Sequence, residues 1–196
     1  MELAFLTKAF FIERGYTMEE KDWLYEAAFY YKENLENKRF HLKAGKSGIL
    51  LEFDILFTND HFKHLLGLHK LTDIAQVRVP SSILYQRILN KEISQSEMKA
   101  SLSYFFIEDR LKYFKELKAV LFSKNLMIKS LHGEFNTIIA DFMLTRKENS
   151  YGYAHLFLKE QEKGFTIPVT FFTREDNAYL KNNPNKWTVL SLEEIE

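Results

Sequence analysis

The sequence of 196 residues contains no cysteine. A chain without cysteine has no disulfide framework, no thiolate nucleophile and no Cys-ligated zinc site, and it can work in a reducing compartment. Glycine and proline are scarce, at 7 and 3 residues, and no apolar run approaches the ~20 residues that span a bilayer. The segment Met1–Lys8 lacks the basic region of a signal peptide. We therefore predict a soluble, cytoplasmic protein with no membrane partner, folded as a single domain over residues 1–196.

Net charge is also absent, because 27 Lys and Arg balance 27 Asp and Glu. This balance argues against a protein that coats nucleic acid non-specifically, since such binding depends on neutralising phosphates. The charge is unevenly spread, however: residues 1–60 carry −3, residues 61–147 carry +6 and residues 148–196 carry −3. This pattern has two interpretations. Either the charges lie on ordinary solvated helix faces, or the basic central part forms a local surface that holds a phosphate-bearing substrate.

Apolar and aromatic side chains are abundant, at 46% and 15% of the residues. Their spacing predicts a helix over residues 18–37 and a hairpin over residues 39–53. A short helix is predicted from near His61 to Gly67, where glycine is a natural stop. Further helices are predicted over residues 81–91 and 94–123, and Phe105 and Phe106 belong to the apolar stripe of the second.

The last third of the chain consists of short apolar runs separated by turn-like pieces. Consecutive strands joined by short turns predict an antiparallel sheet. The predicted fold class is therefore α+β, with helices packed against a small antiparallel β-sheet. Aromatic residues outside the apolar stripes can stack on bases, and Tyr85, Tyr151 and Tyr179 are the exposed candidates.

Three of the six histidines, His61, His64 and His69, fall within nine residues. His61 and His64 share a helix face, whereas His69 lies beyond Gly67 and is expected to point elsewhere. The segment lacks a His-Glu-x-x-His pattern, so neither a metal nor a cofactor is expected. His64 is a candidate for proton transfer, because imidazole titrates near neutral pH, or it is an ordinary packing residue.

Other chemistry-bearing patterns are weaker. No Gly-x-Ser-x-Gly elbow or phosphate loop is present. The run around Thr170 alternates, so that Thr170 and Phe172 face one side of a strand and Thr173 faces the other. Either this is an edge strand with ordinary hydroxyls, or Thr170, Thr173 and Arg174 lie near a phosphate.

Three segments resemble a known family. They are the Phe-x-His-Leu-x-Gly-Leu motif at Phe62–Leu68, the run Tyr153–Leu158 and the run Ile167–Phe172, and Trp187–Leu190 follows as a closing strand. This combination resembles the phage-associated branch of the barnase–EndoU–colicin–RelE-like (BECR) nuclease group. The resemblance extends from about Tyr25 to Leu192.

The resemblance implies a barnase-like α+β fold and metal-independent cleavage of RNA, in which the ribose 2′-hydroxyl attacks the phosphate. It implies His64 as general base or acid and Thr170 as a residue that positions the phosphate. Chemistry and strand spacing add His155 as a further catalytic candidate, and Arg174, Thr173 and Lys63 as phosphate-binding candidates.

One departure from the resemblance is a central helical insertion over residues 80–124, which could serve a partner rather than catalysis. The leading prediction is an RNase-like, toxin-like protein of phage or prophage origin with RNA as its substrate. The alternative is a non-catalytic interaction protein with the same fold, such as an inhibitor that binds a host factor or a defence system. A wholly different fold with accidental matches was the third possibility.

Overall fold

The computed structural model describes residues 21–123, 126–129, 138–148, 152–162, 164–181 and 185–196. The helices are α2 (Trp23–Asn34), α3 (Phe62–Leu66), α4 (Ser81–Leu89), α5 (Gln95–Lys99), α6 (Phe105–Tyr113), α7 (Leu117–Leu121) and α8 (Ala178–Lys181). Short 3-10 turns are η1 (Asn59–His61), η2 (Leu68–Lys70), η3 (Ala75–Arg78) and η4 (Phe114–Glu116). The strands are β1 (Arg39–Lys46), β2 (Ile49–Leu56), β3 (Leu126–Lys129), β4 (Phe142–Glu148), β5 (Gly152–Glu160), β6 (Phe165–Arg174) and β7 (Lys186–Ile195).

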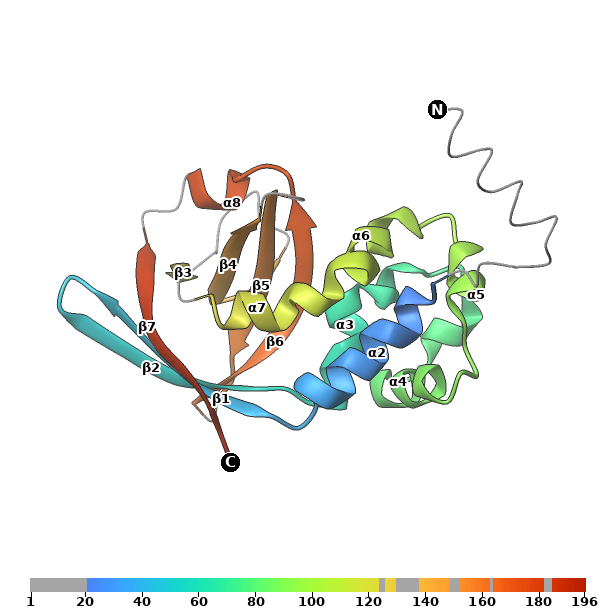
Figure 1. Ribbon diagram of the computed structural model, residues 1–196, viewed down its shortest axis with the longest axis horizontal. Helices are drawn as coiled ribbons and strands as arrows, with labels where there is room; N and C mark the ends of the chain where they lie inside the picture. The colour runs from blue at the N-terminus through green and yellow to red at the C-terminus, as the bar shows by residue number, and fades with distance from the viewer. Residues whose placement is uncertain (1–20, 124–125, 130–137, 149–151, 163, 182–184) are drawn as a thin grey trace, which may run out of the picture.

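The strands and most of the helices lie in two adjoining halves (Figure 1). Helices α2 to α5 gather on one side, and the curled sheet stands on the other. Helix α6 runs from the helical half towards the sheet and contacts β6, while α7 packs against β4 and β5. This arrangement confirms the α+β class, and it places the junction between the halves beside β6.

The described strands pair in the order β1-β2-β6-β5-β4-β3-β7, and β7 returns to pair with β1, so the sheet closes on itself. The prediction of a small, wholly antiparallel sheet was therefore wrong in two respects. Seven described strands take part, and β2 pairs with β6 in parallel, with Asp54 opposite Phe165. A parallel pair needs a long crossover, and here the chain passes through α3 to α7 and three strands between β2 and β6.

The predicted hairpin is confirmed as β1 and β2. Lys46 pairs with Ile49, which leaves Ser47 and Gly48 as a two-residue turn. Both turn residues have positive φ, at 49° and 79°, and this backbone matches the twist of the flanking strands. The turn chemistry is local, which explains why the sequence predicts it.

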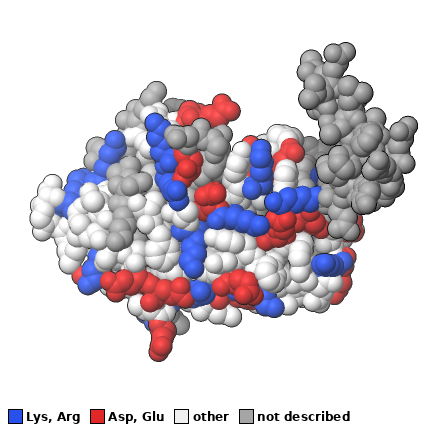
Figure 2. Space-filling view, viewed as in Figure 1, with Lys and Arg blue, Asp and Glu red and all other residues white. Residues whose placement is uncertain are grey.

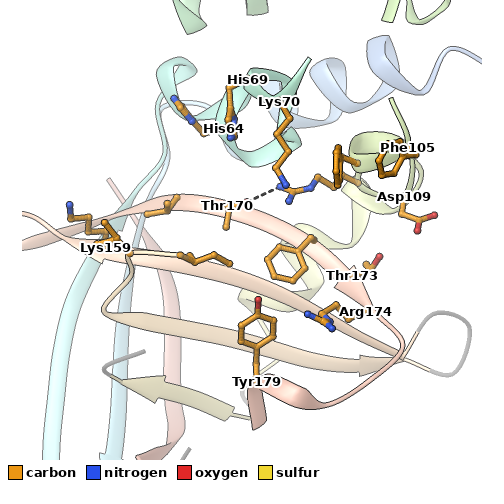
Figure 3. Close-up of a pocket in the computed structure, with 16 residues that line it drawn as sticks. His64, His69, Lys70, Phe105, Asp109, Lys159, Thr170, Thr173, Arg174 and Tyr179 are labelled. Carbon is orange, nitrogen blue, oxygen red and sulfur yellow. Dashed lines mark hydrogen bonds between the residues drawn. The ribbon is translucent and has the colours of Figure 1, made fainter. Parts of the chain in front are cut away.

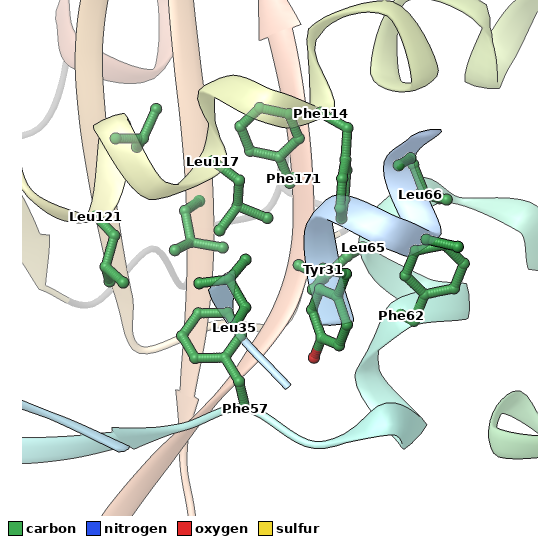
Figure 4. Packing of buried hydrophobic residues seen from close by; sticks show 14 of the residues in the cluster. Tyr31, Leu35, Phe57, Phe62, Leu65, Leu66, Phe114, Leu117, Leu121 and Phe171 are labelled. Atoms are coloured by element: carbon green, nitrogen blue, oxygen red, sulfur yellow. The ribbon is translucent and has the colours of Figure 1, made fainter. Parts of the chain in front are cut away.

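The core is continuous across the junction and centres on Tyr31 of α2 (Figure 4). The Tyr31 ring packs against Phe62 and Phe114 at centroid distances of 5.5 and 6.3 Å, and Phe114 meets Phe171 of β6 edge-on at 6.0 Å. The Tyr31 hydroxyl donates a 2.6 Å hydrogen bond to the carbonyl of Thr58, so its polar end is satisfied. Because one cluster joins helices and sheet, residues on α3, α6 and β6 are fixed relative to one another.

The long helix predicted over residues 94–123 is instead broken into α5, α6, η4 and α7. Asp73 explains the first break, because its carboxylate accepts hydrogen bonds from the Ser101 hydroxyl (2.5 Å) and the Leu102 backbone N–H (2.9 Å). A side chain 29 residues away has thus captured a backbone donor that a continuous helix would need. The expectation that Tyr85 is exposed was also wrong, since its ring is fully buried in the core.

Within the described part of the chain, no helix is both long and apolar enough to cross a membrane. The segment predicted as an insertion, residues 80–124, forms α4 to α7 where it is described, and these helices are part of the same core.

Candidate functional site

A cleft of about 800 Å³ lies at the junction between the helical half and the sheet. It is lined by side chains from α3, η2, α6, β6 and α8, together with Lys159 of β5 and the residues 138–139 that precede β4 (Figure 3). Among the described residues that line it, the Lys and Arg side chains are Lys70, Arg110, Lys159 and Arg174, and the one carboxylate is that of Asp109. The cleft is large enough for a nucleotide and carries an excess of positive charge.

Charge is unevenly spread over the face of the molecule shown in Figure 2. In Figure 2, Lys and Arg side chains gather across the middle of the molecule, and Asp and Glu side chains line its lower edge. Lys70 and Arg110 come from the basic central part of the sequence, whereas Lys159 and Arg174 come from the acidic last part. Folding therefore assembles the basic surface from both parts. The charge count pointed only to the central part, whereas Arg174 was predicted from strand spacing.

His64 and His69 form one edge of the cleft. Gly67 ends α3 in the left-handed conformation, with φ 74°, and turns the chain so that η2 runs back beside α3. The two imidazole rings then lie 4.8 Å apart, which corrects the expectation that His69 points elsewhere. Gly67 is recognisable in the sequence as a helix stop, whereas the direction of the turn that follows it is not.

Both histidines are neutral at pH 7. Partial burial, and then the charge of Lys63, lowers the pKa of His64 below its ordinary value. Partial burial, the neighbouring His64 and the charge of Arg110 lower the pKa of His69 to about 4. A neutral imidazole accepts a proton, so this edge of the cleft is suited to a base.

Arg110 of α6 forms the floor of the cleft. Its side chain is only 7% exposed, and its Nη1 donates a 2.7 Å hydrogen bond to the Thr170 hydroxyl. The guanidinium also lies 5.3 Å from the centre of the Phe172 ring, and Gly67 packs against it so closely that a Cβ would stand 3.1 Å from Nη1. Burial lowers the Arg110 pKa to about 10, so the group is still charged at neutral pH.

Arg174 and Tyr179 form the wall opposite the histidines (Figure 3). The Arg174 guanidinium lies 5.4 Å from the centre of the Tyr179 ring and 2.9 Å from the Asp176 carboxylate. The Arg174 pKa is raised, first by its hydrogen bond to Asp176 and also by the Tyr179 hydroxyl. Tyr179 also interacts with the charge of Arg110, so its hydroxyl lies near both guanidinium groups.

Four of the six predicted site residues line this cleft, namely His64, Thr170, Thr173 and Arg174. Thr170 and Phe172 both line it and Phe171 turns into the core, as the strand alternation predicts. Thr173 departs from the alternation, which placed it on the opposite face, because it lines the cleft as well. Lys63 is outside the lining, and its Nζ donates a 3.0 Å hydrogen bond to the carbonyl of Val79.

His155 is also outside the lining, because β5 carries it into the interior, where it is fully buried. The Thr145 hydroxyl donates to the Ala154 carbonyl (3.2 Å) and lies 3.0 Å from His155 Nδ1. We therefore assign the proton to Nδ1, as the donor to Thr145. Nε2 then has no hydrogen-bond partner among the described residues. The ring lies 5.5 Å from Tyr179 and supports the wall of the cleft from behind.

Arg110, His69, Phe105 and Phe106 line the cleft but were not among the predicted site residues. Arg110 had a signal, because it shares the helix face of Ile107 and Leu111 and a lone charge on an apolar face is unusual. Phe105 and Phe106 were assigned to the apolar stripe, yet they are 65% and 50% exposed and line the cleft. Tyr151, the third stacking candidate, lies outside the described residues.

No group of three or more His, Asp or Glu side chains is placed to hold a metal ion in the described ranges. The observed site is thus a cationic cleft with two neutral imidazoles at its edge. On its floor the Thr170 hydroxyl accepts a hydrogen bond from the buried Arg110.

The mixed α+β fold with a curled sheet and helices is consistent with the BECR group of nucleases. The family model described as phage-Barnase-EndoU-ColicinE5/D-RelE like nuclease4 (PBECR4) matches residues 23–196, and the chain belongs to this family. Membership confirms the resemblance and indicates a nuclease-type function with nucleic acid as substrate. No curated protein and no solved structure matches the chain. The phage or prophage origin, the toxin-like role, the cytoplasmic location and the host protein partner stay predictions.

Proposed function

We propose that the protein is an endoribonuclease that cleaves RNA without a metal ion, by transesterification in the cleft between α3, α6 and β6. The observation that carries this proposal is the neutral His64 at the edge of a cleft whose floor is the hydrogen-bonded pair Arg110 and Thr170. A base next to a fixed cation and hydroxyl is the arrangement that an attack by a ribose hydroxyl on a phosphate requires.

The reaction moves one proton at each end of the phosphate. The 2′-hydroxyl gives its proton to a base as its oxygen forms a bond to phosphorus. The bond from phosphorus to the 5′-oxygen breaks, and that oxygen takes a proton from an acid. The products are a 2′,3′-cyclic phosphate and a 5′-hydroxyl, so no protein nucleophile is needed.

His64 is the base. Its lowered pKa leaves the imidazole neutral at pH 7, and the nearby charge of Lys63 contributes to this. His69, with a pKa of about 4, is equally unsuited to be an acid. Because the attacking and leaving oxygens lie on opposite sides of phosphorus, and the two rings are only 4.8 Å apart, the acid comes from a different wall.

Tyr179 is our candidate for the acid. It lines the wall opposite the histidines, and its hydroxyl interacts with the charges of Arg110 and Arg174. In this role the Tyr179 hydroxyl gives its proton to the leaving 5′-oxygen from a position beside both guanidinium groups.

Arg110 holds the phosphate. Its guanidinium is buried and fixed by Thr170 before substrate arrives, so it stabilises the extra negative charge of the transition state without reorganisation. Arg174, exposed at the rim, adds a second cation beside the same phosphate.

The test is incubation of labelled RNA with the protein in excess EDTA. We expect cleavage that yields 2′,3′-cyclic ends, that is lost in His64→Ala and that is blocked by a 2′-deoxy residue at the scissile position. His41→Ala is the matched control, because His41 lies on β1 outside the cleft. Activity that appears only with added metal would refute the mechanism, and no cleavage of any RNA would favour the interaction protein.

Tyr179→Phe separates the acid from the base. We expect its loss of activity to be largest with natural RNA and small with a substrate whose 5′-oxygen is replaced by a better leaving group. Equal losses with both substrates would show that Tyr179 is not the acid.

A further inference from the structure

Phe105 and Phe106 form an exposed aromatic pair at the start of α6. Their ring centroids lie 4.0 Å apart, and both side chains line the cleft that holds Arg110. Ile139, which is 66% exposed, lines the same cleft. Single exposed apolar side chains are ordinary, but three that line one polar, charged cleft together mark a candidate binding surface.

The aromatic pair is continuous with the cationic floor. The Lys70 ammonium lies 5.3 Å from the centre of the Phe106 ring, and burial together with the charge of Arg110 lowers the Lys70 pKa. A phosphate bound by Lys70 and Arg110 therefore carries its neighbouring nucleoside towards Phe105 and Phe106.

We propose that Phe105 and Phe106 form a stacking subsite for an unpaired nucleobase next to the phosphate held by Arg110, which makes single-stranded nucleic acid the substrate class. This inference rests on the proposed function, because the nucleobase reaches the subsite through its phosphate. A duplex keeps its base faces stacked inside the helix, so it offers no face to an aromatic ring. Stacking tolerates any base and does not need the 2′-hydroxyl.

The experiment measures binding in a His64→Ala background, so that cleavage plays no part. A fluorescent single-stranded RNA octamer, its duplex and the DNA octamer of the same sequence are titrated by anisotropy at fixed salt. We expect Phe105→Ala to weaken binding of both single strands by about 5- to 150-fold, the range for loss of one stacked base. Phe105→Trp should bind single strands as tightly as Phe105 does. Duplex binding should be weaker than single-strand binding, and neither variant should change it.

Phe29→Ala is the matched control. Phe29 is 50% exposed, like Phe106, but it lies on α2 and lines a different, smaller pocket. The proposal is overturned if Phe105→Ala binds single strands as Phe29→Ala does, or if duplex binds as tightly as single strands.

The two proposals fail separately. If the RNA octamer binds in a Phe105-dependent way but the wild-type protein never cleaves RNA, the subsite stands and the ribonuclease proposal falls. If RNA is cleaved and Phe105→Ala leaves binding unchanged, the ribonuclease proposal stands and the subsite falls.

Discussion

Mild acid should destabilise the protein through His155, and replacing this residue should remove that part of the effect. Burial lowers its pKa to about 4, from an ordinary value of 6.5. The unfolded chain thus binds a proton at pH 5 that the folded protein excludes. Stability from this residue is fully present above pH 6.5 and is lost as the pH falls towards 4. Between pH 7 and pH 5 the loss is about 2 kcal/mol.

The local structure explains why the proton is excluded. Protonation of Nε2 would place an N–H donor among the rings of Phe157, Phe172 and Tyr179, whose centroids lie 5.5 to 6.3 Å from that of His155. In the described part of the chain, no acceptor is within hydrogen-bond distance of Nε2. Phenylalanine has nearly the same shape and no titrating group. Thr145 keeps its hydrogen bond to the Ala154 carbonyl when His155 is replaced.

The assay is urea unfolding at pH 7 and pH 5, followed by the fluorescence of the two tryptophans. His61 and His69 also have lowered pKa values and destabilise the wild type in acid, so the informative quantity is the difference between wild type and His155→Phe. We expect the variant to lose about 2 kcal/mol less than the wild type over this interval. An equal loss in both proteins would refute the assignment of a neutral, unpartnered imidazole at this position.

Three further perturbations test the charges and the turn around the cleft. His41→Gln should reduce stability at low pH and not at high pH. The hydrogen bond to Asp54 raises the His41 pKa, so the stability that His41 contributes is present below pH 6.5 and lost at higher pH. Urea midpoints of wild type and variant at pH 5.5 and 8 check this. Gly67→Ala should destabilise the fold by about 1–3 kcal/mol. It should also reduce cleavage, because the added Cβ would stand 3.1 Å from the Arg110 guanidinium and push it out of place. Gly48→Ala is the control, because Gly48 also has a positive φ but its added Cβ meets nothing within 4 Å, so cleavage should be unchanged. Arg110→Lys should lower kcat for RNA about 100-fold, because an ammonium loses the fork geometry that meets both hydroxyl and phosphate, and an unchanged kcat would contradict its proposed role.

Elements whose signals are local were predictable from the sequence. The β1–β2 hairpin depends on alternation and on a two-residue turn with positive φ at Ser47 and Gly48. Helix α3 ends at Gly67 because the residue there must adopt a left-handed conformation. In each case the residues that decide the structure lie within a few positions of one another.

Features that depend on distant partners were not predictable. The parallel pairing of β2 with β6 joins Asp54 to Phe165, and the start of β6 is fixed there by a hydrogen bond from Thr166 to the Asp54 carbonyl. The break before α6 depends on Asp73, which no periodicity in residues 94–123 reveals. A single sequence shows which faces are apolar but not which faces meet.

The candidate site follows the same division. His64 and Thr170 were identified because a sequence motif and strand alternation place them, and both line the cleft. His155 has the residue type of a catalyst, yet β5 is buried on both faces from Ala154 to Leu158, so the strand carries this side chain into the interior. Arg110 was missed because its partner Thr170 lies 60 residues away.

The central helices, residues 80–124, contribute to the cleft. Residues 80–124 were expected to form an insertion that could serve a partner rather than catalysis. In the structure this segment supplies Arg110 to the floor of the cleft and Phe105 and Phe106 to its rim. The same helix that buries Ile107 and Leu111 in the core therefore fixes both the cation and the aromatic pair that we propose bind phosphate and nucleobase. A variant without residues 80–124 would lose its binding site together with part of its core, so the segment is inseparable from the proposed activity.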